Sequence, residues 1–320
     1  MSYKHITLIQ RNELSVLIQA QVKQKEIAEL LNKHRSTIYR ERIRNSSSNG
    51  KYNARTAKRL TKERRINANS RFRKIDNNPN LQKKIIKGIR KYWSPEQISG
   101  RFERKGIRIG KDSIYEFVYE KNQTLIKYLR CSKGKYRRRK GTGKRIKQRQ
   151  NMENTRNISN RPLIVEAKER LGDWEGDTVL GGIKAGPVLL TNNERKSGLI
   201  LISKIKRRQA ELVLEETKKR FKNIPKHKRK TMTYDNGGEF AEYEAIEKET
   251  GMDVFFANPY HSWERGSNEN GNGLIRQFFP KKTNFDNIQE RDIKRVERLL
   301  NNRPRKRLNY LTPKEVFFNS

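Results

Sequence analysis

Three acidic residues stand in surroundings that a hydrophobic core would not supply. Asp177 lies in Gly-Asp-Trp-Glu-Gly-Asp-Thr-Val, Asp235 begins Asp-Asn-Gly-Gly-Glu-Phe, and Glu269 has Asn, Gly, Ser and Arg neighbours. Carboxylates are the ligands that Mg²⁺ prefers, usually a few of them together with a substrate phosphate. Two such ions, about 3.5–4 Å apart, assist an in-line displacement at phosphorus. We therefore predict that Asp177, Asp235 and Glu269 are metal-binding catalytic residues that hold two Mg²⁺ ions, with Mn²⁺ as an alternative.

Each acid also has a simpler interpretation. Asp173, Glu175 and Asp177 alternate along an expected strand and so share one face, where they repel unless a cation joins them. A solvent-facing acidic strand is nevertheless commonplace. The Asp-Asn-Gly-Gly sequence at Asp235 is equally a good hairpin turn, and Glu269 can be an ordinary surface acid.

The segment around Glu269 breaks a local rule. Gly271 and Gly273 make it a poor helix by propensity, although apolar residues follow at helical spacing. Such conflicts concentrate at functional sites, and we interpret the small residues as room for a nucleic-acid backbone. On a helix, Arg265 and Arg276 share a face with Glu269, where we expect them to clamp phosphates.

A run of alternating strands and helices must position these acids. The expected elements have the order βββαβαβα, which is the order of a ribonuclease H-like domain. They are strands 174–180, 187–191 and 199–204, helix 209–221, strand 230–235, helix 239–249, strand 253–257 and helix 267–279.

The composition points to a polyanionic partner. Lys and Arg number 75 against 35 Asp and Glu, a net charge of +40, and only 32% of residues are hydrophobic. The single cysteine, Cys131, excludes an internal disulfide, and the four histidines form no zinc motif. With no apolar run long enough for a membrane span and no secretion signal, we expect no membrane contact. The expected location is the cytoplasm, in association with the nucleoid.

The N-terminal region has a helix-turn-helix pattern. A helix is expected over 7–20, beginning with a Thr-x-x-Gln capping pattern at Thr7, and another over 24–32. A third follows, which Ser36 or Thr37 caps and which ends near Arg44. Ile38 faces inward, whereas Thr37, Arg40, Glu41 and Arg44 share the face that would read the DNA major groove. Any small three-helix bundle gives the same pattern. We predict that Thr37, Arg40 and Arg44 bind double-stranded DNA.

A second helical pattern and a basic arm follow. Helices are expected over 81–92, from a Ser94 cap to Phe102, and after an Asp112 cap, which indicates a second helix-turn-helix or a structural helical pair. Between 133 and 149 there are ten cations and no acid, so this arm cannot fold alone and would attach to DNA in a salt-sensitive way. Its predicted DNA-binding residues include Arg137, Arg138 and Arg139.

These patterns predict a multidomain protein with all-α helix-turn-helix modules ahead of an α/β ribonuclease H-like, retroviral integrase-like catalytic domain. The expected divisions are a helix-turn-helix domain at 1–45, a basic linker or helix at 46–78, a second helix-turn-helix-like module at 79–130, a basic linker at 131–165 and the catalytic domain at 166–320, with C-terminal helices.

The acidic motifs together resemble the insertion-sequence-thirty family of bacterial DDE transposases. Asp177 and Asp235 are separated by 57 residues, and Asp235 and Glu269 by 33, the latter being an interval that this family shows. The likeness covers essentially the whole chain. His261 and Gly271 depart from it, because they stand where Ser and Thr are more usual. The matching segments are 172–179, 235–240, 263–270 and 273–280, with further likeness at 25–28, 36–41, 93–98, 300–308 and 312–317.

This resemblance implies that Asp177, Asp235 and Glu269 are the metal ligands and that the N-terminal modules bind the element's terminal inverted repeats. A family member hydrolyses a phosphodiester at the element end and joins the freed 3′-hydroxyl to another strand. Because two ends must be cut and joined, we expect at least a homodimer on DNA. Two alternatives are a DNA-binding regulator, which leaves the carboxylates unexplained, and a nuclease that cuts without joining.

Overall fold

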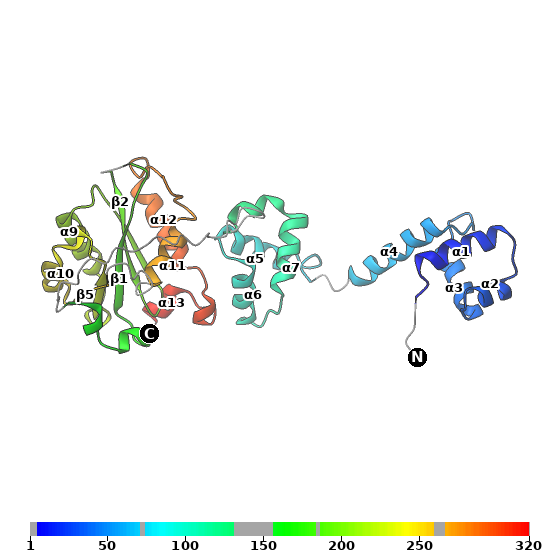
Figure 1. Ribbon diagram of the computed structural model, residues 1–320, viewed down its shortest axis with the longest axis horizontal. Helices are drawn as coiled ribbons and strands as arrows, with labels where there is room; N and C mark the ends of the chain where they lie inside the picture. Colours follow the sequence, from blue (N-terminus) through cyan, green and yellow to red (C-terminus); the bar gives the residue numbers. More distant parts are fainter. Residues whose placement is uncertain (1–4, 71–73, 131–155, 184–185, 259–265, 320) are drawn as a thin grey trace. The chain divides into compact units, whose positions relative to one another are not determined.

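The structure is a computed structural model that describes residues 5–70, 74–130, 156–183, 186–258 and 266–319 (Figure 1). The chain divides into two compact units, Met1–Pro79 and Asn80–Ser320. The two units are described separately below.

The first unit is helical. The predicted cap of its first helix is present, because Thr7 Oγ1 accepts a hydrogen bond from the amide of Gln10 at 3.2 Å and Gln10 Oε1 accepts one from the amide of Thr7. The third helix begins earlier than predicted, because His34 caps it rather than Ser36 or Thr37. The helices are α1 (Leu8–Gln19), α2 (Gln24–Leu30), α3 (Arg35–Asn45) and α4 (Ala54–Ser70).

Helix α4 belongs to the core of this unit. Tyr52, just before the helix, and Ala57 within it are buried with residues of the first three helices such as Leu14 and Ile38. Arg11 of α1 donates to Thr61 of α4 at 3.0 Å. The basic stretch that the sequence marks only as helix-compatible therefore packs on the helix-turn-helix through its apolar side.

A second helical module opens the second unit. The predicted Ser94 capping box is confirmed, with Gln97 as its partner and Pro95 at the first helical position. Gly110 precedes the next helix, so Asp112 lies in its first turn and is not its cap. The elements are α5 (Pro79–Arg90), α6 (Pro95–Glu103), α7 (Lys111–Glu116), η1 (Phe117–Lys121) and η2 (Gln123–Tyr128).

A five-stranded sheet forms the centre of the remaining domain, in the order β3-β2-β1-β4-β5. The first three strands are an antiparallel meander, and β4 and β5 run parallel to β1. This confirms the predicted integrase-like α/β fold. The strands are β1 (Asp173–Val179), β2 (Val188–Glu194), β3 (Ile200–Ile205), β4 (Thr231–Tyr234) and β5 (Asp253–Phe256).

Helices cover both faces of this sheet, with α9 and α10 on one side and α11 and α12 on the other (Figure 1). Because strand residues alternate, Trp174 packs in the first layer with Phe221, whereas Val179 packs in the second with Leu274 and Ile293. The long helices are α9 (Ala210–Phe221), α10 (Tyr243–Thr250), α11 (Gly266–Ile275) and α12 (Glu290–Asn301). The short elements are η3 (Ile158–Asn160), α8 (Ile164–Ala167), η4 (Lys226–Lys228), η5 (Gly238–Phe240), η7 (Lys306–Leu308) and α13 (Pro313–Phe318).

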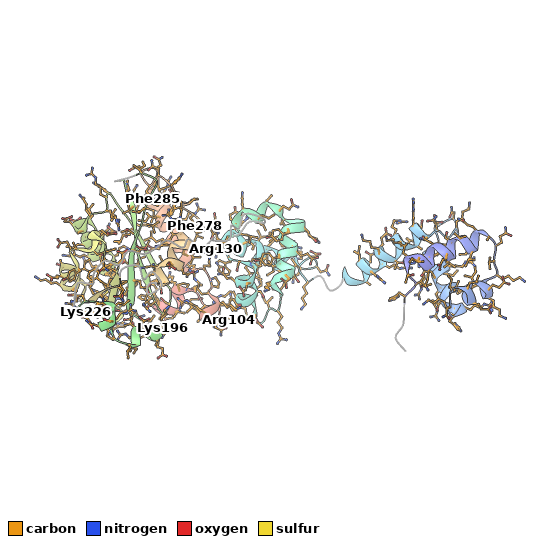
Figure 2. The ribbon with its side chains drawn as sticks, in the orientation of Figure 1. Arg104, Arg130, Lys196, Lys226, Phe278 and Phe285 are labelled. Atoms are coloured by element: carbon orange, nitrogen blue, oxygen red, sulfur yellow. The ribbon has the colours of Figure 1, made fainter. Side chains whose placement is uncertain are left out.

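The second helical module packs against the C-terminal segment of the sheet domain. Arg101 of α6 forms an ion pair with Glu315 of α13, and Arg104 donates to the carbonyl of Asn309 at 3.1 Å. The rings of Tyr92 and Phe278 meet edge to face with centroids 4.7 Å apart. Figure 2 labels Phe278 and Arg104, which take part in these contacts. Helix α6 therefore has a structural role within the second unit. None of the helices in the described part of the chain is both long and apolar enough to cross a membrane.

Candidate active site

The predicted acidic face of β1 is present. Asp173, Glu175 and Asp177 lie on the side of the sheet that α11 covers, where Glu175 accepts from the amide of Asn268 and Asp177 from the side chain of Asn272. Trp174 points to the opposite face, against Phe221. The period-two alternation of the strand therefore determines which acids share a face.

Two of these three acids are neutralised by arginine, so the cations that relieve the repulsion at Asp173 and Glu175 are supplied by the protein itself. Arg170 forms a bidentate ion pair with Asp173, with both N–O distances at 2.9 Å. Arg195 donates to Glu175 at 2.8 Å, and both side chains are almost completely buried. Asp173 and Glu175 are therefore structural acids of the sheet.

Asp177 is held differently. Its Oδ2 accepts from Asn272 Nδ2 at 2.7 Å, and its Oδ1 accepts from the amide of Thr178 at 2.8 Å. Asn272 is in α11, so this hydrogen bond ties the end of β1 to the helix that carries Glu269. The carboxylate is half-buried, and these two neutral donors orient it.

Asp235 lies near Asp177, toward the C-terminal ends of the parallel strands β1 and β4. Strands β1 and β4 are parallel, and Glu175 is paired with Thr233. Asp177 and Asp235 each follow two residues after this pair, so the two acids stand on adjacent strands, which are about 4.8 Å apart in a sheet.

The hairpin interpretation of Asp-Asn-Gly-Gly is wrong. The next strand, β5, is parallel to β4 and is reached through α10. Asp235 Oδ1 accepts from the amide of Gly237 at 3.1 Å, and Asn236 donates to the carbonyl of Ala257 at 2.8 Å. These contacts form a compact turn that leads from β4 into η5.

Glu269 lies in the first turn of α11, which forms across Gly271 and Gly273 as predicted. The carboxylate is exposed and has no hydrogen-bond or ion-pair partner among the described residues. Asn272, one turn later on the same helix, contacts Asp177. Helix α11 therefore joins the strand that bears Asp177 to the segment that bears Glu269.

Gly271 and Asn268 of α11 have a packing role, so these two residues are explained without a nucleic-acid backbone beside them. A methyl group at Gly271 would collide with the side chain of Asn193 in β2. Asn268 is buried, donates to the carbonyl of Gly176 at 3.0 Å and accepts from Asn193 at 2.6 Å. Small and amide side chains thus let the helix lie directly on the sheet.

We expect Gly271→Ala to lower the stability of the second unit by about 1–3 kcal/mol, because Asn193 must move and lose its bond to Asn268. Gly273→Ala is the matched control, since its added methyl group would meet only the flexible end of Arg130, at 3.4 Å. That control should be neutral or gain up to about 1 kcal/mol from helix propensity. Thermal unfolding measures both, and equal melting temperatures for the two variants would contradict the packing role.

The chemistry of these residues fits a hard divalent cation, since Asp177, Asp235 and Glu269 offer only carboxylate oxygens. Among the described residues, no three His, Cys, Asp or Glu side chains stand close enough to form a closed metal site. Glu269 is exposed and unpaired within the same part of the chain, so its side chain has the freedom to turn toward an ion. The role of the three acids as metal ligands therefore stays a prediction.

Comparisons with known proteins agree with this geometry. The family described as "Integrase core domain" matches residues 167–262, and "Helix-turn-helix domain" matches residues 2–45. The transposase for insertion sequence element IS4351 of Bacteroides fragilis is 40% identical over 98% of this chain and 95% of its own length. The chain belongs to the insertion-sequence-thirty family of transposases.

Two further similarities accompany this assignment. Transposase InsI for insertion sequence element IS30A of Escherichia coli strain K12 is 34% identical over 98% of this chain and 83% of its own length. The catalytic core domain of BIV integrase, a solved structure, has a TM-score of 0.37 and 18% identity over 47% of this chain and 95% of that one. The transposase relatives, together with the match of residues 167–262 to the integrase core family, identify the protein as a DNA transposase of the DDE polynucleotidyl transferase class. Proteins with this integrase core depend on divalent metal ions.

Glu239 is a residue of this transposase whose importance the sequence did not reveal. Its side chain is buried, pairs with Arg208 and accepts from Thr178 Oγ1 at 3.0 Å. A methyl group at Gly237 would collide with Glu239 Oε2 and lie 2.9 Å from Asp235 Oδ1, so the two carboxylates converge on one glycine. Its place in Asp-Asn-Gly-Gly-Glu-Phe was the only signal, and a surface acid would give the same pattern.

The predicted DNA-reading face of α3 is partly open to solvent. Arg40 and Arg44 are exposed and Thr37 is half-buried. Glu41 was expected on this face, but it forms an ion pair with Arg11 at 2.7 Å and accepts from Tyr52 at 3.2 Å. Glu41 therefore joins α3 to the other helices of the first unit.

The other predicted phosphate contacts have separate outcomes. Arg276 donates to the carbonyls of Leu180 at 2.8 Å and Pro280 at 3.3 Å, and burial lowers the pKa of its guanidinium. Its guanidinium thus joins α11 to the end of β1, and its role as a clamp stays a prediction. Arg265 and the arm residues Arg137, Arg138 and Arg139 lie outside the described residues, as does His261.

Proposed function

We propose that this transposase binds the terminal inverted repeats of a mobile element, cuts a phosphodiester at each end and joins the freed end to target DNA. Asp177, Asp235 and Glu269 would hold two Mg²⁺ ions, with Mn²⁺ as an alternative. The observation that carries this proposal is the 2.7 Å hydrogen bond from Asn272 to Asp177, because it links the helix of Glu269 to the sheet edge that Asp177 shares with Asp235.

The chain's own residues would orient the reacting groups. Asn272 and the amide of Thr178 donate to the two oxygens of Asp177, while the Glu239–Arg208 pair supports the turn that carries Asp235. These donors to Asp177 fix its direction without adding a charge, which suits a ligand of a cation. When bound, two divalent ions would activate the attacking oxygen and stabilise the leaving oxygen.

Two displacements at phosphorus account for the reaction. In the first, water attacks the phosphodiester at the element end, one P–O bond breaks and a 3′-hydroxyl is released. In the second, that 3′-hydroxyl attacks a phosphodiester of the target strand and the target's own 3′-oxygen leaves. Since both ends of the element must react together, we propose that at least two copies of the chain assemble on DNA.

Several cations would attach the DNA. In this proposal α3 reads the major groove, and the basic arm follows the phosphate backbone in a salt-sensitive way. The residues proposed for these contacts are Thr37, Arg40, Arg44, Arg137, Arg138, Arg139, Arg265 and Arg276.

Incubating the full chain with Mg²⁺, a labelled duplex from the element's end and a target plasmid tests the proposal. We expect nicking at the element end and joined products, both of which disappear with EDTA and return with Mg²⁺ or Mn²⁺. Absence of metal-dependent nicking would refute the proposal. Nicking without joining would make the protein a nuclease.

A further inference from the structure

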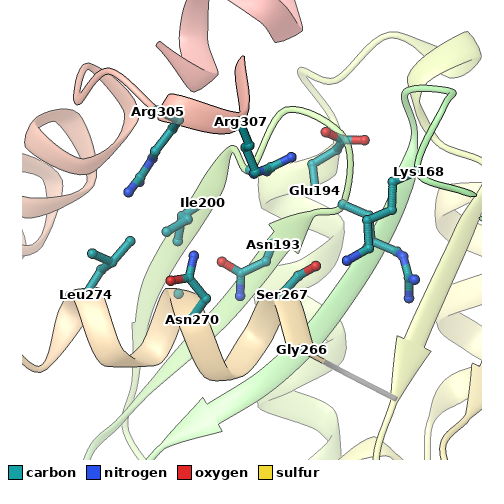
Figure 3. Close-up of a pocket in the computed structure, with 13 residues that line it drawn as sticks. Lys168, Asn193, Glu194, Ile200, Gly266, Ser267, Asn270, Leu274, Arg305 and Arg307 are labelled. Atoms are coloured by element: carbon teal, nitrogen blue, oxygen red, sulfur yellow. The ribbon is translucent and has the colours of Figure 1, made fainter. Parts of the chain in front are cut away.

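A pocket of about 230 Å³ lies between the first turns of α11, the turn from β2 to β3 and the segment that follows α12 (Figure 3). We call it the basic pocket. Gly266, Ser267 and Asn270 line it from α11, the helix that carries Glu269. Its charged lining residues are Lys168, Glu194, Arg195, Arg305 and Arg307.

The only acid among these lining residues, Glu194, is held mainly by hydrogen bonds within the β2–β3 turn. Glu194 Oε2 accepts from the amide of Ser197 at 2.6 Å and from its hydroxyl, and Glu194 Oε1 accepts from the amide of Gly172 at 3.2 Å. Burial raises the pKa of this carboxyl group. Glu194 therefore closes the β2–β3 turn and forms no ion pair with a lining cation among the described residues, although its charge acts on Arg307.

One of the cations, Arg195, is already paired. It donates to Glu175 at 2.8 Å and to Glu166 at 3.1 Å. Lys168, Arg305 and Arg307 remain, and none of them has a carboxylate partner among the described residues. Arg305 donates to the carbonyl of Leu300 and Arg307 to that of Lys196, so their positions are fixed although their charges are unbalanced.

Besides burial, the charge of Arg307 lowers the pKa of both Arg305 and Lys168. Burial and the nearby charges of Arg303 and Arg307 lower the pKa of Arg305 to about 9. Burial and the nearby Arg195 lower the pKa of Lys168. Arg305 remains protonated at neutral pH, so the pocket holds a partly buried positive charge that an anion would relieve.

A glycine supports this arrangement on the sheet side. Gly198, in the β2–β3 turn, has a φ of +71°, and a methyl group there would collide with the Arg307 guanidinium. The space that this glycine leaves open is occupied by a cation. Arg305 and Arg307 thus enter the pocket from one segment, and Ser267 and Asn270 add neutral polar groups from α11 (Figure 3).

We propose that the basic pocket binds a backbone phosphate of the DNA on which the transposase acts. The pocket lies at the N-terminal turns of α11, the helix that carries Glu269, but its lining residues Ser267 and Asn270 lie on a different face of that helix from the acid. DNA that reaches the carboxylates comes within one helix diameter, roughly 10 Å, of the pocket, and a backbone phosphate there would meet Lys168, Arg305 and Arg307. This assignment rests on the proposed function and deepens it, since it names a DNA contact close to the reacting phosphate.

The test is the salt dependence of DNA binding by the full chain in EDTA, where no cutting occurs. The probe is a fluorescein-labelled duplex taken from the DNA that flanks the coding sequence. Lys168→Gln combined with Arg307→Gln should reduce the slope of log affinity against log salt by about one, because one phosphate contact is lost. At physiological salt the affinity should fall about fivefold.

Two matched variants sharpen this measurement. Lys222→Gln with Lys226→Gln removes two exposed charges beside α9, on the other side of the sheet, and should keep the wild-type slope. Lys168→Arg with Arg307→Lys retains both charges and should do the same. Lys168 and Arg307 are exposed, and circular dichroism verifies that each variant is folded.

Inorganic phosphate distinguishes the source of the anion. If phosphate raises the melting temperature of the wild type but not of the Lys168→Gln, Arg307→Gln variant, and the DNA slope is unchanged, the pocket takes a free anion and the DNA assignment is wrong. A slope equal to that of the Lys222→Gln, Lys226→Gln control also overturns it. Because binding is measured without metal, loss of metal-dependent nicking would refute the proposed function and leave this result standing.

Discussion

Replacing Asp177 or Asp235 with Asn, or Glu269 with Gln, should lower DNA cutting by about a thousandfold or more while DNA binding in EDTA stays within about twofold. Each change removes one negative charge from the proposed metal site, and metal catalysis contributes several kcal/mol to such reactions, with about 1.4 kcal/mol for each factor of ten. The folds should persist. Asp177→Asn keeps its shape beside Asn272, and Glu269 has no partner to lose among the described residues.

The matched control is Asp253→Asn. Asp253 is exposed at the first position of β5, which lies parallel to β4. It therefore lies at the opposite end of these parallel strands from Asp235, which follows the last residue of β4. Its loss should leave cutting near the wild-type rate. If Asp253→Asn is as damaging as Asp235→Asn, the defect reflects general charge and not a site at the edge shared by Asp177 and Asp235.

A cysteine variant separates metal ligation from other roles of the carboxylate. Asp177→Cys should be inactive with Mg²⁺, which prefers hard oxygen ligands, and should regain part of its cutting with the softer Mn²⁺. Recovery in Mn²⁺ indicates that residue 177 touches the ion. Full activity of the Asn variants with Mg²⁺ would instead exclude these acids as ligands.

The sequence predicts those features of the fold that depend on short-range periodicity. The alternation in β1 predicts that Asp173, Glu175 and Asp177 share a face, because side chains of a strand point to opposite sides in turn. The capping boxes that begin at Thr7 and Ser94 are found as predicted, since each involves residues only three positions apart. The order βββαβαβα follows from the same local signals.

Contacts between distant segments were not predictable in this way. Arg195, in the turn after β2, neutralises Glu175 of β1. Asn193 of β2 is the side chain that requires glycine at position 271. The sequence around Glu175 or Gly271 does not indicate these partners. The sequence therefore indicated repulsion where the structure has ion pairs, and DNA clearance where it has helix–sheet packing. Tertiary contacts decide such questions, and local propensity cannot.

Asp235 illustrates a third case, in which local chemistry permits two structures. Asp-Asn-Gly-Gly suits a two-residue hairpin and also suits a turn from a parallel strand into a helix. The pairing of β4 with β1 and β5, both parallel, selects the second. Because this choice lies in the topology of the sheet, the role of Glu239 at the end of the same turn was also hidden.

Arg195→Met should destabilise the second unit by about 3–5 kcal/mol and lower its melting temperature by about 10 °C. The change leaves the Glu175 carboxylate buried without its cation, next to the first turn of α11. The amide of Asn268 still donates to Glu175 at 3.0 Å, but one neutral donor cannot replace a guanidinium. Lys218→Met, which breaks the exposed pair with Glu249, is the control and should cost less than about 1 kcal/mol.

The double variant Arg195→Met, Glu175→Gln decides whether an unpaired charge causes this loss. After Glu175→Gln, the side-chain oxygen can still accept from the amide of Asn268, but no charge is left to bury, so at least half of the lost stability should return. If the double variant loses as much as the two single changes combined, the pair contributes no coupling. Cutting activity should follow the same pattern, because the amide of Asn268 that Glu175 holds directly precedes Glu269 on α11.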